Sequence, residues 1–249
     1  NTVAEALVDS VGMVAFTLGA SVSQNFTSPG TRSKSVAMVR SEFLKAQDYI
    51  RKMKDKDPAK RPDRDLKLET LVKVLNGEIK AMFTAQQATD IVAALRLAKE
   101  FGFKLVLDGA AEAYLLVDEI KKAGVPVILH PTMVRTGGDT RNASMETAAI
   151  LKKAGIPIAL QSGFESYVPK TRVVLFEAAL AAANGLTFNN ALAAITIDAA
   201  RLLSLEKRIG SLEAGKDADV VLFDGDPFEY TTRVCAVIID GIVASETCR

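Results

Sequence analysis

Residues 104–130 read "KLVLDGAAEAYLLVDEIKKAGVPVILH" and hold a complete strand–helix–strand pattern. The apolar runs at 104–108 and 125–130 have the length of buried strands, while residues 111–124 between them have helical spacing and end on Gly124. A glycine that ends a helix just before a Pro-containing strand is typical of a short helix-to-strand connection. The stretch therefore predicts two parallel strands joined by a helix.

The same alternation continues on both sides of this stretch. Strands separated by helices predict parallel βα units, and the shorter apolar runs near the C-terminus predict an antiparallel tail. A parallel sheet of five strands has two open edges, whereas a closed barrel of this kind has eight strands. We expect a partial (β/α) barrel domain at 1–205 and C-terminal strands of a second unit at 206–249. The expected strands lie at 12–18, 79–85, 104–108, 125–130 and 156–161, and the expected helices at 34–53, 66–76, 88–102, 111–124, 144–155 and within 171–204.

The composition argues against several classes of protein, among them nucleic-acid-binding and membrane-spanning proteins. The 249 residues include 31 basic and 30 acidic side chains, so the chain lacks the charge excess expected of a nucleic-acid-binding protein. No apolar run reaches the roughly 18 residues that a membrane span needs. Cys235 and Cys248 have no metal-type spacing, and two thiols do not make a disulfide framework. Because the chain begins with Asn1 rather than Met, we expect an earlier segment or processing, and the compartment stays open.

The C-terminal stretch carries a family resemblance. Residues 197–245, "IDAARLLSLEKRIGSLEAGKDADVVLFDGDPFEYTTRVCAVIIDGIVAS", resemble the end of the metal-dependent amidohydrolase superfamily, close to its imidazolonepropionase-like branch. Residues 89–135 and 151–201 resemble barrel strands five to eight with their helices. The resemblance implies an α/β fold, a (β/α)8 TIM barrel with strands four to eight in this chain, followed by strands of a small β-sandwich. It also implies a hydrolase that acts on C–N bonds.

The resemblance also implies where metal ligands would lie. In that family they are a His-x-His pair on strand one, histidines on strands five and six, and an aspartate on strand eight. Position by position, Thr84, Gly109 and Gly163 take the last three places, and strand one has no counterpart. Neither Thr nor Gly supplies an imidazole or a carboxylate. We therefore expect that this chain holds no metal and no other cofactor.

Polar side chains at or just past the expected strand ends form the candidate site. Side chains that act as acids, bases or hydrogen-bond donors there are typical of a pocket for a small polar molecule. The candidate catalytic residues are Gln86, Asp108, Glu112 and His130, and the candidate ligand-binding residues are Thr84, Arg135, Gln161, Ser162 and Glu165.

Each candidate also has a structural interpretation, because strand ends are polar wherever a loop begins. His130 precedes Pro131, and a histidine in that position serves equally as a hydrogen-bonded loop anchor. The carboxylate of Glu112 would also stabilise the N-terminus of the helix that follows strand six. The sequence leaves both interpretations open.

Three hypotheses follow. In the first, the protein is an amidohydrolase-like enzyme that hydrolyses a C–N bond without the usual metal ligands. In the second, it is a catalytically inactive, metal-free relative that binds a ligand or serves a structural role. In the third, which is compatible with either, it is one part of a split amidohydrolase, and a second polypeptide or a missing N-terminal segment supplies the first barrel strands.

The expected helix at 172–185, "RVVLFEAALAAANG", is apolar on more than one face. Such a helix is either deeply buried or part of an interface. It predicts an oligomer.

Overall fold

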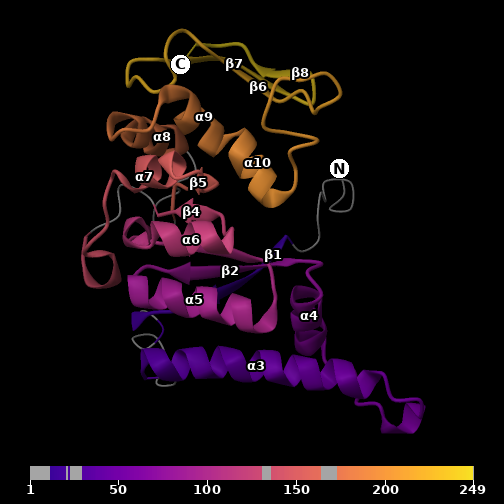
Figure 1. Ribbon diagram of the computed structural model, residues 1–249. Coiled ribbons are helices and arrows are strands. Elements are labelled where there is room, and N and C mark those ends of the chain that lie inside the picture. The colour runs from indigo at the N-terminus through magenta and orange to yellow at the C-terminus, as the bar shows by residue number, and fades with distance from the viewer. Residues whose placement is uncertain (1–11, 21, 23–29, 131–135, 164–172, 249) are drawn as a thin grey trace.

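The computed structural model describes residues 12–20, 22, 30–130, 136–163 and 173–248. Its centre is a sheet of five parallel strands in the order β1-β2-β3-β4-β5, and a separate antiparallel sheet holds β6-β7-β8 (Figure 1). The predicted βα alternation is confirmed.

The strands are β1 (Met13–Thr17), β2 (Lys80–Ala85), β3 (Leu105–Gly109), β4 (Val127–Leu129), β5 (Ile158–Leu160), β6 (Val220–Phe223), β7 (Val234–Ile239) and β8 (Ile242–Ser245). The helices are α3 (Arg32–Met53), α4 (Leu66–Leu75), α5 (Ala88–Phe101), α6 (Val117–Ala123), α7 (Thr147–Lys153), α8 (Val174–Ala183), α9 (Phe188–Ile195) and α10 (Ile197–Leu203), with single 3₁₀ turns η1 (Pro58–Lys60), η2 (Ala113–Leu115) and η3 (Gly138–Thr140).

The two faces of the parallel sheet bury different layers, because successive side chains of a strand point to opposite faces. On one face the strands contribute Phe83 and Leu107 to the main core under the surrounding helices. On the other face Val106 packs with Met82 in a smaller cluster that includes Leu202 of α10. The period of two then places Thr84 and Asp108 on this second face, at the carboxyl-terminal ends of β2 and β3.

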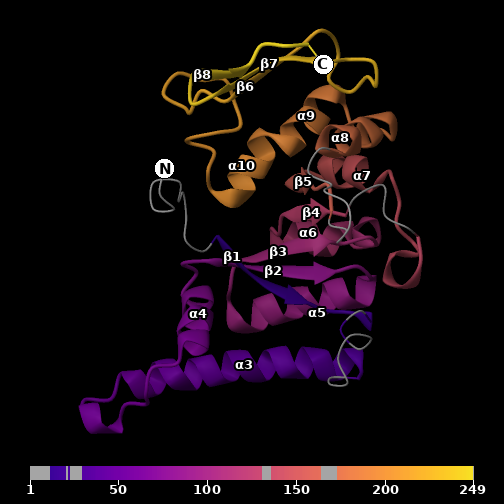
Figure 2. The same cartoon turned by 180° about the vertical axis from the view of Figure 1, so that it is seen from behind.

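The long helix α3 lies on the outside of the molecule beside α5, and α4 leads the chain back toward β2 (Figures 1 and 2). The helix begins where the hydroxyl of Thr31 accepts a hydrogen bond from the backbone N–H of Lys34 at 3.2 Å. Its buried stripe of Phe43, Ala46 and Tyr49 has helical spacing and faces the core. Phe43 joins the helix to the sheet through aromatic contacts with neighbouring elements.

The structure divides the predicted helix at 111–124. A 3₁₀ turn, η2, comes first, and the α-helix α6 begins only at Val117. The break falls at Leu116, whose φ of −126° and ψ of 32° are not helical. The helix ends as predicted, because Gly124 has a φ of +65° in the left-handed region that glycine adopts most readily.

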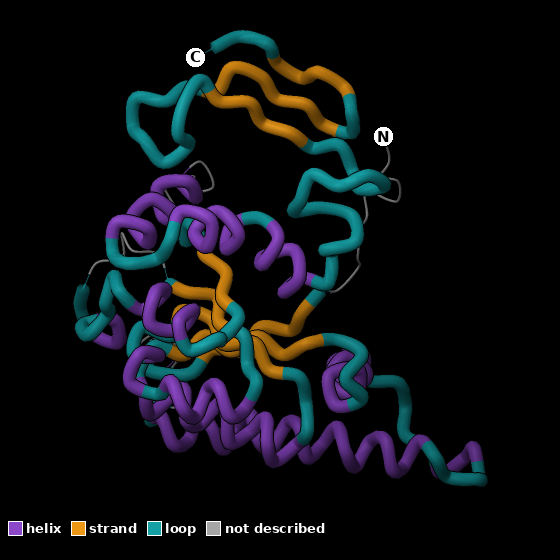
Figure 3. The backbone as a smooth tube through the Cα atoms, turned by 45° about the horizontal axis from the view of Figure 1, so that its top comes forward, coloured by secondary structure: helices purple, strands orange, loops and turns teal. Residues whose placement is uncertain are grey.

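The C-terminal region contains three short helices and then the antiparallel sheet, which lies beyond α8, α9 and α10 at one end of the molecule (Figure 3). The predicted antiparallel tail is confirmed. A disulfide joins Cys235 of β7 to Cys248, which follows β8, so the two thiols that suggested no framework are paired with each other. Within the part of the chain that the structure describes, no helix has the length and apolar character to cross a membrane.

Candidate functional site

Three side chains from three strands meet at the carboxyl-terminal edge of the parallel sheet. Thr84 on β2 donates its hydroxyl hydrogen to Oδ2 of Asp108 on β3, with an O–O distance of 2.6 Å. Gln161, just after β5, donates Nε2 to Oδ1 of the same carboxylate at 2.7 Å. Thr84 and Asp108 are direct neighbours in the strand ladder, whereas Gln161 reaches past β4. We call Thr84, Asp108 and Gln161 the Asp108 cluster.

The Asp108 cluster combines one carboxylate with two neutral donors. Each oxygen of the Asp108 carboxylate accepts one hydrogen bond, and an ionised carboxylate has room for about four. All three side chains are half-buried, so the remaining lone pairs are not sealed in the core. The cluster can therefore bind a polar group or accept a proton from one.

Gln86 covers the end of β3. Its Oε1 accepts a hydrogen bond from the backbone N–H of Ala111 at 3.2 Å. A Cβ added to Gly109 would lie 2.3 Å from Nε2 of Gln86, closer than any real contact allows. Gly109 also has a φ of +77°, which favours glycine. A larger residue at position 109 would therefore displace Gln86 and strain the backbone.

Glu112 is buried and held by two neutral donors. Its Oε2 accepts from the backbone N–H of Ala88, the first residue of α5, at 2.7 Å. Its Oε1 accepts from Nδ2 of Asn142 at 2.7 Å. The carboxylate thus stabilises a helix N-terminus, as one interpretation of the sequence proposed, but the helix is α5 rather than the one that follows Glu112.

His130 lies directly after β4 at the same edge and is only 6% exposed. Its backbone N–H donates to the carbonyl of Gly109 at 2.8 Å, which ties the end of β4 to the end of β3. Ser162 is half-buried one residue after Gln161. Two of the predicted ligand-binding residues, Arg135 and Glu165, lie outside the described residues.

An ionic cluster at the same edge was not predicted. Arg32, the first residue of α3, pairs with both Asp90 in the first turn of α5 and Asp139 in η3. The backbone N–H of Ala20 donates to Asp139 Oδ2 at 2.7 Å. Burial raises the pKa of Asp90 above its ordinary value, although its hydrogen bond and ion pair with Arg32 oppose that shift.

These contacts were invisible to the sequence because they are long-range. The partners of Arg32 lie 58 and 107 residues away along the chain, and Asn142 lies 30 residues from Glu112. The only sequence feature that pointed to this cluster was Asp90, which lies in the first turn of α5. An acidic residue there is also expected simply because it stabilises the helix dipole. The cluster fastens the segments that follow β1, β2 and β4 to one another.

The described residues do not fit a metal ion at this edge. Nowhere in that part of the chain do three His, Cys, Asp or Glu side chains come together closely enough to hold one. Thr84 at the end of β2 directs its hydroxyl to Asp108, and Gly109 and Gly163 at the ends of β3 and β5 carry no donor. Asp108 and Glu112 are each held by neutral hydrogen-bond donors. A structural zinc site needs four ligands of the nitrogen, sulfur or carboxylate type, and a catalytic one needs three.

Comparison with known proteins points to one family. A family described as the amidohydrolase family matches residues 78–244. Imidazolonepropionase of Shouchella clausii is 34% identical over 115 residues, which make up 45% of this chain and 25% of that protein. Amidohydrolase tasK of Hapsidospora irregularis is 29% identical over 189 residues, or 71% of this chain and 18% of that protein.

The fold has a close counterpart among solved structures. A crystal structure of an amidohydrolase from Thermotoga maritima superposes with a TM-score of 0.90 and 32% identity over 98% of this chain and 65% of that chain. The match supports the TIM-barrel fold. Five parallel strands of that fold lie in this chain. The chain spans less than two thirds of the length of each of these three proteins.

Proposed function

The chain belongs to the amidohydrolase family, and from that premise we propose that it binds a small polar molecule at the carboxyl-terminal edge of its parallel sheet and hydrolyses a C–N bond there without a metal ion held by its own residues. The observation that carries the proposal is the Asp108 cluster, which brings polar side chains from three strands together. Enzymes with a barrel of parallel strands build their sites at this edge.

The chemistry available at this edge is that of a general base with positioned amides. In hydrolysis the oxygen of a water molecule bonds to the carbon of the C–N bond, the C–N bond breaks, and the nitrogen leaves with a proton. Asp108 is the group that would take the proton from water and pass it to the leaving nitrogen. Thr84 and Gln161 hold the carboxylate in place, and Gln86 offers its amide to the substrate.

The absence of metal ligands from this chain is the second part of the proposal. It rests on the donor chemistry of the strand ends, where a hydroxyl and two glycines replace imidazole and carboxylate. It also rests on Gln86, which fills the space that a side chain at position 109 would need. The residues that remain suit hydrogen bonding and proton transfer rather than coordination.

One observation favours a second candidate function, ligand binding without catalysis. Both oxygens of Asp108 already accept hydrogen bonds from other strands, so the carboxylate also serves to fasten β2 and β5 to β3. The buried carboxylate of Glu112 serves the N-terminus of α5 in the same way. A site whose carboxylates are used for structure binds a polar molecule but leaves its bonds intact.

Further barrel strands from a second polypeptide or an N-terminal segment are also part of the proposal. In this chain β1 and β5 are the two edges of the sheet. A groove of about 690 Å³ runs beside β1 and is lined by apolar side chains that include Val14, Phe16 and Leu71. An open strand edge beside an apolar groove suits a strand with its helix. Self-association is proposed as well, because α8 leaves Phe176 48% exposed.

A binding and turnover screen tests the function. The protein is incubated with small amides, ureas and cyclic amides, and both line broadening and product signals are followed by proton NMR. We expect at least one compound to bind and to be hydrolysed: a linear amide to equal amounts of amine or ammonia and carboxylate, a cyclic amide to one ring-opened amino acid, and a urea to two amines or ammonia for each carbonate. Binding without product supports the second candidate. If no compound binds, both functions are contradicted.

A further inference from the structure

A second cavity lies between α5 and α6, beside the amino-terminal ends of β2, β3 and β4 and thus at the opposite edge of the sheet from the Asp108 cluster. It is lined by facing side chains of the two helices and by residues 102–106 and 122–126. Its volume is about 840 Å³, which falls within the range of small-molecule sites. We call it the α5–α6 groove.

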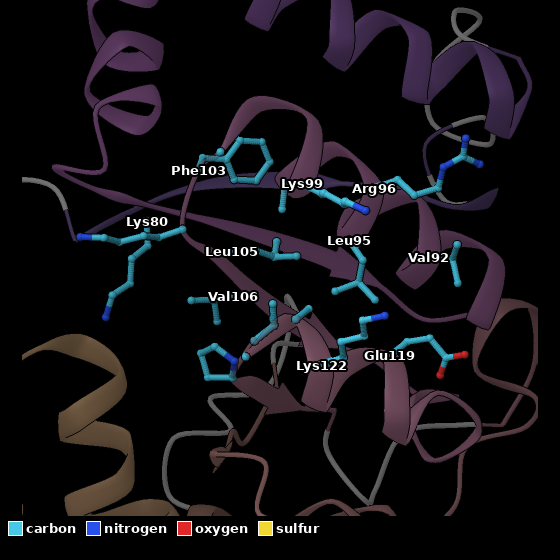
Figure 4. A pocket seen from close by; sticks show the side chains of 17 residues that line it. Lys80, Val92, Leu95, Arg96, Lys99, Phe103, Leu105, Val106, Glu119 and Lys122 are labelled. Atoms are coloured by element: carbon cyan, nitrogen blue, oxygen red, sulfur yellow. The ribbon is translucent and has the colours of Figure 1, made fainter.

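The floor of the α5–α6 groove is apolar. Phe103 and Leu105 are each 5% exposed, and Val125 is 6% exposed. Leu95 and Val92 of α5 add half-buried apolar surface from one wall (Figure 4). The buried side chains form a fixed apolar floor, and the half-buried Leu95 and Val92 supply the apolar surface that a ligand would remove from water.

The rim of the groove carries a concentration of positive charge. The chain as a whole is balanced, with 31 basic and 30 acidic residues. Around the groove, Glu119 is the single acidic residue among those that line it. The basic residues that line it are Lys80, Arg96, Lys99, Lys104 and Lys122.

Two of these cations are held in place by hydrogen bonds to backbone carbonyls. Nζ of Lys80 donates to the carbonyl of Leu202 at 2.5 Å, and Nζ of Lys104 donates to the carbonyl of Gly77 at 2.8 Å. Burial lowers the pKa of Lys80, and repulsion from Lys104 adds to the effect. The carboxylate of Glu206 opposes this shift, so the charge of Lys80 is partly balanced from outside the lining of the groove.

Two other cations are available for a ligand. Lys99 on α5 and Lys122 on α6 lie on either side of Leu95 in Figure 4. Both are exposed, and neither forms an ion pair with another described residue. Their position in the last turn of a helix suits the helix dipole, but that explanation applies equally to Lys121, which does not line the groove.

We propose that the α5–α6 groove binds a small organic anion with an apolar body, of the class of medium-chain carboxylates. The apolar floor takes the body, and Lys99 and Lys122 contact the carboxylate. A small molecule suits the site better than a peptide, because the cavity lies between two helices and its volume of about 840 Å³ is that of a small-molecule site. This site is separate from the one that carries the proposed hydrolysis.

A charge series of ligands tests the proposal. Octanoate, octanol and octylammonium share an apolar chain and differ in the charge of the head group. Isothermal titration at pH 7 is expected to show octanoate binding about tenfold more tightly than octylammonium, since the lysines attract one charge and repel the other. Raising the salt concentration should reduce this difference. Equal binding of the two ions, or no binding of octanoate, overturns the proposal.

Matched variants locate the site. Lys99→Glu and Lys122→Glu are each expected to weaken octanoate binding about tenfold, because each replaces attraction by repulsion. Lys121→Glu makes the same charge change in the same helical turn outside the groove and should leave the affinity nearly unchanged. Asp108→Asn, at the other edge of the sheet, should also leave it unchanged. If Lys121→Glu weakens binding as much as Lys122→Glu, the groove is not the site.

Discussion

Asp108→Asn is expected to lower kcat/KM for the hydrolysed compound by about 100- to 10,000-fold, the usual contribution of a general base. Asparagine has nearly the shape of aspartate but cannot take a proton from water. Its amide can keep both neighbours, because the oxygen accepts from Gln161 while the NH2 group donates to the hydroxyl oxygen of Thr84. Steady-state rates measured with the compound found in the screen give the result directly.

Two controls separate chemistry from folding. Asp118→Asn removes an exposed carboxylate from α6 and should leave the rate unchanged. Urea unfolding should show that Asp108→Asn costs no more than about 1–3 kcal/mol of stability, because hydrogen bonds to a carboxylate are replaced by weaker ones to a neutral amide. A variant that stays folded and keeps more than half of the wild-type rate would show that Asp108 is not the base. If the wild-type protein binds a compound without hydrolysing it, and Asp108→Asn weakens that binding, the result supports ligand binding without catalysis.

Phe43→Ala is expected to lower the free energy of unfolding by about 3–5 kcal/mol, the range for deleting a fully buried aromatic ring. Phe43 is 0% exposed and is the ring through which α3 meets the sheet. Its centroid lies 5.5 Å from Phe16 of β1, 5.1 Å from Phe101 of α5 and 4.9 Å from Phe103. The variant leaves a cavity that three other rings border, and these cannot all move inward together.

Phe188→Ala is the matched control, because Phe188 is also an aromatic residue of a helix with one ring neighbour, Phe228 at 4.8 Å. Phe188 is 41% exposed, so its removal should cost no more than about 1.5 kcal/mol. Urea unfolding followed by circular dichroism measures both variants. Equal losses for the two would mean that Phe43 does not anchor α3 to the sheet.

The fold could be predicted because its signals are local. The apolar runs of β2 to β5 and the glycine that ends α6 each act within a few residues, and the structure confirms them. The extent of a helix depends on more than its spacing. Residues 111–124 have helical spacing, yet the backbone breaks at Leu116 and only the second half forms an α-helix.

The candidate site could be predicted only in part. Parallel strands have their carboxyl-terminal ends at one edge of the sheet, so the sequence alone predicts that Thr84, Asp108 and Gln161 lie near one another. It could not show that all three share hydrogen bonds, because that depends on the curvature of the sheet past β4. The hydrogen bond from Asn142 to Glu112 could not be predicted either, because Asn142 lies in a loop whose sequence has no helical or strand periodicity.

The metal content of the purified protein tests the central claim most directly. The protein is produced in medium supplemented with zinc, iron and manganese, dialysed without chelator, and analysed by inductively coupled plasma mass spectrometry. Because Thr84, Gly109 and Gly163 supply no metal-binding group, we expect far less than one equivalent of any of these metals. One or more tightly bound equivalents, lost together with hydrolysis on chelation and restored with it, would contradict a site that works without metal.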